Sequence, residues 1–118
     1  MTKVTKGTTT KEKVATYETT EPLLEALYRE IQDLTKKKPD GTLNQTKIKM
    51  INRLLQDIQT FLKDEPDSKY LDLLEDESLP QYSDVTLILS QWSTSVKTFH
   101  EKYYGFDQVA REHRWFVK

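Results

Sequence analysis

The longest helical pattern in this sequence runs from Ser83 to Tyr104, and its middle carries almost no charge. Large apolar residues recur there every three or four positions, which places them on one helix face; they are Val85, Ile88, Leu89, Trp92, Val96, Phe99 and Tyr103. The opposite face of a solvated helix should be charged. Here that face consists of Leu87, Ser90, Thr94 and Thr98. We therefore expect this helix to be covered on two sides, either inside its own bundle or by a partner.

Two amphipathic helices are predicted before this one. The first begins at Thr19, where two hydroxyl residues, an acid and Pro22 form a typical helix start, and it ends before a turn at Pro39. The second is capped by Thr42 or Asn44 and continues to about residue 63. Its apolar residues make the cleanest one-sided pattern in the chain.

Shorter helices are predicted on either side of the long one. The first runs from about Ser68 to Glu77, between two proline-containing breaks. Gly105 is expected to end the long helix as a glycine cap. A last helix is then predicted from Asp107 to about Phe116.

Helices of this length joined by short turns pack as antiparallel neighbours. We therefore predict an all-α fold, a small antiparallel bundle of about four main helices, in a single domain over residues 21–118. Residues 1–20 contain eight threonines and four lysines, and threonine is a poor helix former. We expect this segment to be a flexible arm, extended or disordered.

The formal net charge of −1 conceals an uneven distribution. Residues 64–84 hold eight acidic side chains and one basic side chain, Lys69, so this block carries −7 and the remainder carries +6. Such an asymmetry can steer association with a partner. A solvated acidic face is the simpler interpretation of the same block.

Several kinds of chemistry are excluded or unsupported. The chain contains no cysteine, which excludes disulfides, thiolate nucleophiles and cysteine-bound metals. The two histidines, His100 and His113, have no acidic residue at the spacing of helical metal sites. The three glycines cannot form a phosphate-binding loop. We therefore predict no catalytic residue, no metal site and no cofactor.

The expected location is the cytoplasm, in soluble form and without membrane contact. The first residues lack the apolar core of a secretory signal. No apolar run approaches the length needed to cross a bilayer.

The leading interpretation is a non-enzymatic protein–protein interaction or assembly subunit. Its partner is another protein chain or a second copy of itself, so a homo-oligomer is one form of this hypothesis. Large aromatic side chains often dominate binding at interfaces, and the C-terminal segment alternates rings with basic residues. The predicted partner-binding residues are Leu87, Ser90, Thr94, Thr98, Tyr104 and Trp115.

Two alternatives remain open at this stage. The first is a nucleic-acid-binding accessory factor, because rings beside cations bind exposed bases; its contacts are Lys47, Lys49, Arg53, Arg111 and Arg114. The sequence pI near 6.1 is low for such a protein. The second is a small enzyme or toxin-like effector, for which no nucleophile can be named.

Overall fold

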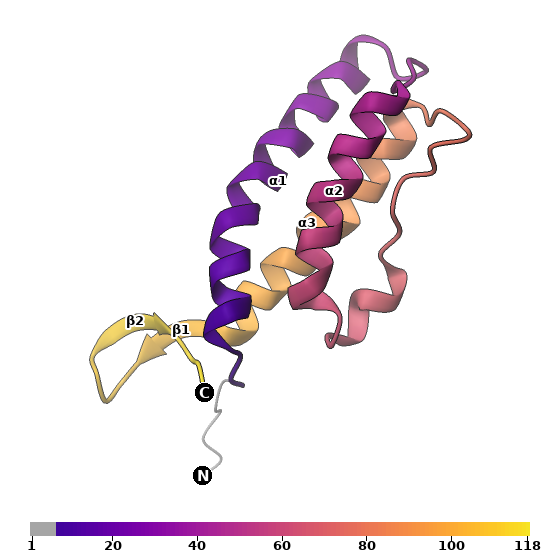
Figure 1. The fold of residues 1–118 in the computed structure, drawn as a ribbon. Helices are drawn as coiled ribbons and strands as arrows, with labels where there is room; N and C mark the ends of the chain where they lie inside the picture. The colour runs from indigo at the N-terminus through magenta and orange to yellow at the C-terminus, as the bar shows by residue number, and fades with distance from the viewer. Residues whose placement is uncertain (1–6) are drawn as a thin grey trace.

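The computed structural model describes residues 7–118, which form three α-helices, a short 3-10 helix and a two-stranded antiparallel sheet (Figure 1). The elements in chain order are α1 (Lys11–Lys37), α2 (Gln45–Leu62), η1 (Pro66–Tyr70), α3 (Tyr82–Tyr103), β1 (Tyr104–Asp107) and β2 (Glu112–Trp115). The molecule is elongated, with dimensions of 53 × 24 × 24 Å. The prediction of an all-α fold with about four main helices is therefore wrong.

Helix α1 begins at Lys11, well before the predicted start at Thr19. Thr10 caps it, because its hydroxyl accepts a hydrogen bond from the Lys13 amide at 3.2 Å. Later threonine hydroxyls donate to carbonyls four residues earlier in the same helix, as Thr20 does at 2.7 Å. Val14 is buried, so burial here outweighs the weak helix propensity of threonine. Residues 11–20 of the predicted arm are thus helical, and residues 1–6 lie outside the described residues.

The predictions for the second helix and the long helix are confirmed within one or two residues at each end. Asn44 caps α2 by accepting a hydrogen bond from the Lys47 amide at 2.9 Å. The apolar faces of the three helices meet in one core, in which α1 packs against both α2 and α3. The largest fully buried side chains of this core are Trp92, Phe61 and Phe99.

The helix predicted over residues 68–77 is wrong, because helical structure ends with η1 at Tyr70 and the chain then runs extended along α2 and α3 (Figure 1). Side chains of the neighbouring helices replace the missing helical hydrogen bonds. Asn52 of α2 bonds both the amide and the carbonyl of Leu74, each at 2.8 Å. The indole of Trp92 in α3 donates to the Asp72 carbonyl at 2.9 Å. These bonds and the burial of Leu71 and Leu74 favour the extended conformation.

The last predicted helix is also wrong, because residues 104–115 form the β1–β2 hairpin. Asp107 holds the turn, with Oδ1 accepting hydrogen bonds from the amides of Val109 and Ala110. Gly105 lies in β1 and does not cap α3, and Arg111 takes the positive φ of 56° that closes the turn. The Thr9 amide and carbonyl bond the chain after β2, at Phe116 and Lys118.

Candidate functional site

The outer face of α3 is not part of the core. Leu87 is 63% exposed, Thr94 and Thr98 are exposed and Ser90 is half-buried. Among the described residues no element covers this face. The sequence predicts cover for this face from the bundle or from a partner, and residues 7–118 do not supply the first of these.

The hydroxyl groups of this face are occupied within the helix itself. Ser90 donates to the Leu87 carbonyl at 2.6 Å, Thr94 to the Ser90 carbonyl at 2.9 Å and Thr98 to the Thr94 carbonyl at 2.9 Å. Each donor is therefore already satisfied by its own backbone. A partner that covers this face therefore leaves none of these three hydroxyl donors without a hydrogen-bond acceptor.

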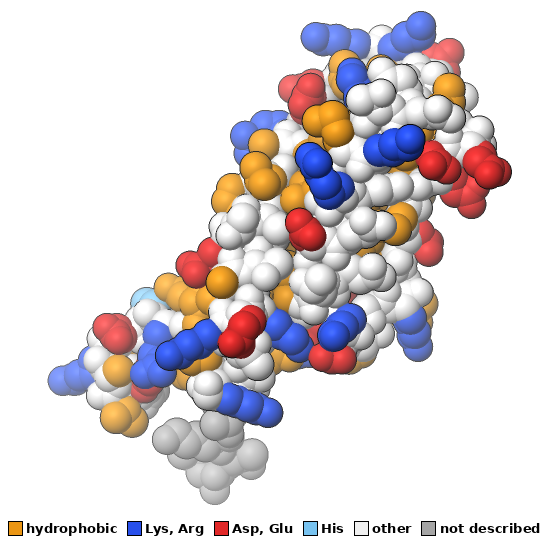
Figure 2. All heavy atoms as spheres, viewed as in Figure 1, with side chains coloured by type: hydrophobic (Ala, Val, Ile, Leu, Met, Phe, Trp, Pro, Cys, Tyr) orange, Lys and Arg blue, Asp and Glu red, His pale blue; other side chains and the backbone are white. Residues whose placement is uncertain are grey.

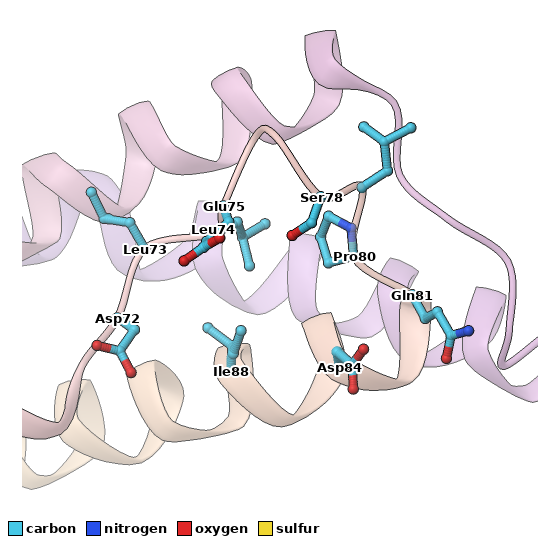
Figure 3. Close-up of a pocket in the computed structure, with 10 residues that line it drawn as sticks. Asp72, Leu73, Leu74, Glu75, Ser78, Pro80, Gln81, Asp84 and Ile88 are labelled. Atoms are coloured by element: carbon cyan, nitrogen blue, oxygen red, sulfur yellow. The ribbon is translucent and has the colours of Figure 1, made fainter.

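A groove of about 780 Å³ lies beside this face, between the extended segment 72–81 and the start of α3. Asp84 and Ile88 project from α3 towards the segment that carries Asp72 and Glu75 (Figure 3). Leu79, which is 45% exposed, adds apolar surface to the same groove. No lysine, arginine or histidine lines it.

The acidic groups that line this groove form no ion pair within residues 7–118. Between Tyr70 and Val96 the sequence holds five carboxylates and no lysine, arginine or histidine. Each of the three ion pairs found within residues 7–118 involves other acids, namely Asp64, Glu65 and Asp107. The carboxylates that line the groove are therefore not neutralised by an ion pair within the described residues.

A second, more apolar groove of about 320 Å³ separates α1 from α2. Its lining consists of leucine and isoleucine side chains with Met50, flanked by Glu30 and Lys47. Met50 is 58% exposed, and Figure 2 shows hydrophobic side chains gathered over these two helices. Sequence reasoning missed this groove because a one-sided apolar pattern does not show which of its residues stay exposed at the surface.

The C-terminal rings pack on one another. The His100 ring stacks between Tyr17, at 5.8 Å, and Tyr104, at 4.6 Å, while Trp115 meets it edge-on at 5.2 Å. Tyr104 and Trp115, which the sequence assigns to partner binding, are both half-buried in this cluster. Much of their ring surface is thus used inside the fold.

The structure does not bring the predicted nucleic-acid contacts together. Lys47, Lys49 and Arg53 lie in the first half of α2, whereas the hairpin with Arg111 and Arg114 lies at the opposite end of the elongated molecule (Figure 1). Arg114 also pairs with Asp107 at 3.3 Å. A single basic surface is therefore not formed from these five residues.

One buried carboxylate was missed at the sequence level. Glu65 accepts hydrogen bonds from Lys102 at 2.7 Å and from the Tyr103 hydroxyl at 2.8 Å. The hydrogen bond to Glu65 raises the pKa of Lys102, and burial raises the pKa of Tyr103. Both groups are thus held in their protonated forms, which suits a structural link and opposes a role as general base.

Within residues 7–118 no group of three or more metal-ligating side chains comes together. In the same range no helix combines the length and the apolar character required to cross a membrane. No known protein family, characterised protein or solved structure matches this chain.

Proposed function

We propose that this chain is a non-enzymatic interaction module that binds a segment of another protein on the outer face of α3. The observation that carries this proposal is Leu87, a large apolar side chain that is 63% exposed on a helix face with no charged group between Asp84 and Lys97. Covering this apolar surface would contribute roughly 25 cal/mol per Å² removed from water.

The internal hydrogen bonds of Ser90, Thr94 and Thr98 support the same function. Burying a hydroxyl without a partner costs free energy, and here the donors keep their partners when the face is covered. The small side chains also let another backbone approach closely. The nucleic-acid alternative is less favoured, because the neighbouring groove carries carboxylates that repel phosphate groups.

A substitution on this face tests the proposal. We expect Thr94→Arg to leave the fold intact, because Thr94 is exposed and its change removes no core contact. The matched control is Gln56→Arg, which adds the same charge at an exposed position of α2. Both proteins, and the wild type, serve as baits for quantitative affinity capture from native cells after cross-linking.

The expected result is a partner protein that Thr94→Arg loses by about tenfold or more, as a buried unpaired charge would cause. Gln56→Arg should retain this partner at the wild-type level. Identical captured proteins with all three baits, when each bait shows the same circular dichroism spectrum, would overturn the proposal.

A further inference from the structure

We propose that the groove between segment 72–81 and α3 receives an extended basic segment of the partner, in which lysine or arginine alternates with apolar residues. This inference rests on the proposed function and assigns a chemical class to the partner. The groove adjoins the outer face of α3 directly, since Ile88 lines the groove and the adjacent Leu87 belongs to the face. One partner chain can therefore contact both surfaces.

Charge identifies the basic character of this segment. Asp72, Glu75 and Asp84 are all exposed along the groove, and no cation lines it with them. A basic segment would supply the missing countercharge and would be steered to the groove over several ångströms. An acidic or phosphate-bearing ligand would meet repulsion at the same three positions.

The backbone of the groove indicates an extended partner. Of residues 72–79, none takes part in a backbone–backbone hydrogen bond. Side chains of α2 and α3 already bond the Leu74 amide and the carbonyls of Asp72, Leu74 and Asp76. The remaining backbone amides and carbonyls of the segment are free to pair with a chain laid alongside it, as in recognition by strand addition. A helix satisfies its own backbone groups and would leave these unused.

Apolar surface on the rim of the groove explains why the proposed partner segment contains apolar residues between its basic ones. Leu79 is 45% exposed on the extended wall, and Ile88 is half-buried on the helical wall. Successive side chains of an extended peptide point in opposite directions. Each wall of the groove carries both acidic and apolar side chains, so a peptide of mixed basic and apolar residues can meet partners of both kinds on either side.

The test uses a fluorescein-labelled peptide of alternating lysine and valine, about ten residues long so that it spans the groove. Fluorescence anisotropy measures its binding to the wild-type chain, to the groove variant Asp72→Asn/Glu75→Gln/Asp84→Asn and to a control variant. The control, Glu18→Gln/Asp33→Asn/Asp57→Asn, removes three exposed carboxylates from α1 and α2 and matches the charge change. A peptide of alternating lysine and serine tests the apolar part.

We expect the groove variant to bind about tenfold more weakly than the wild type, as the loss of three ion pairs at a rim would cause. The control should bind within about twofold of the wild type, and binding should weaken between about 20 and 200 mM salt. The lysine–serine peptide should bind more weakly than the lysine–valine peptide.

Equal weakening by the groove variant and the control would overturn the inference, because it would show attraction to net charge alone. Absence of binding at low salt would overturn it as well. Either result leaves the proposed function standing if Thr94→Arg still loses a captured partner. If that variant loses nothing, the proposed function fails on its own.

Discussion

The carboxylate of Glu65 accepts a hydrogen bond from the Lys102 ammonium group at 2.7 Å, although the Glu65 side chain is only 7% exposed. Two residues later, Asp67 accepts a hydrogen bond from the Ser95 hydroxyl at 2.7 Å. These contacts tie the chain that leaves α2 to the C-terminal half of α3. A short connection is thereby fixed to α3, which α2 also contacts directly through the Phe61 and Phe99 rings, whose centroids lie 4.9 Å apart.

We expect Glu65→Gln to lower the free energy of unfolding by about 1–3 kcal/mol, because charged hydrogen bonds to a buried acceptor are lost. Urea-induced unfolding followed by circular dichroism measures this change. The matched control is Asp64→Asn, whose side chain is 66% exposed in its pair with Lys13. The control should unfold close to the wild-type midpoint, and equal losses in the two variants would contradict the structural role of Glu65.

Stability should fall at alkaline pH. Burial, followed by the charges of Glu21 and Glu18, raises the pKa of Tyr17 to about 12. The pKa values of Lys102 and Tyr103 are raised as well. These groups release their protons more easily in the unfolded chain than in the folded protein. Their contribution to the free energy of unfolding is therefore complete below about pH 10 and is lost as the pH rises further.

Melting temperature measured from pH 7 to pH 12 checks this expectation. The melting temperature should show no loss from these three groups up to about pH 9 and a steep loss above pH 10. Tyr17→Phe should reduce the alkaline loss, and it should remove the last tyrosine ionisation seen by absorbance at 295 nm. A wild-type titration in which every tyrosine ionises near pH 10 would contradict the raised pKa expected for the half-buried Tyr17.

Gly41→Ala should destabilise the fold, because a Cβ atom at this position would lie 2.6 Å from Cε2 of Tyr82. We expect a loss of about 1–3 kcal/mol, as for other overpacked sites. The loss should shrink when Tyr82→Ala is present, which a double-mutant cycle of urea unfolding measures. An unchanged loss in that background would assign the effect to the backbone near Lys38.

Helices α2 and α3 could be predicted because local signals and tertiary packing agree there. Their apolar residues follow one period, and Asn44 supplies a side-chain cap. The sequence also identified the uncharged face that contains Leu87 and predicted that either the bundle or a partner covers it. The sequence alone could not show whether α1 and α2 pack on this face, and their positions in the structure leave it exposed.

A physical reason explains why the hairpin and the extended segment could not be predicted from the sequence. In residues 112–115, the rings of His113 and Trp115 alternate at the period of a strand, but this run is too short to outweigh a helical interpretation. Leu71 and Leu74 have a helical spacing, yet Asn52 holds the Leu74 backbone from another helix. Hydrogen bonds between distant residues leave no local trace in the sequence.

Residues 72–79, which form one wall of the groove, are held by few hydrogen bonds, and this affects their local fluctuations. Leu74 has its amide bonded to Asn52, whereas the amides of Glu75 and Glu77 have no backbone acceptor. Deuterium should therefore enter these two amides by local fluctuation while the helices stay closed. If this segment fluctuates locally while the helices stay folded, the groove can change its width to admit a peptide without global unfolding of the bundle.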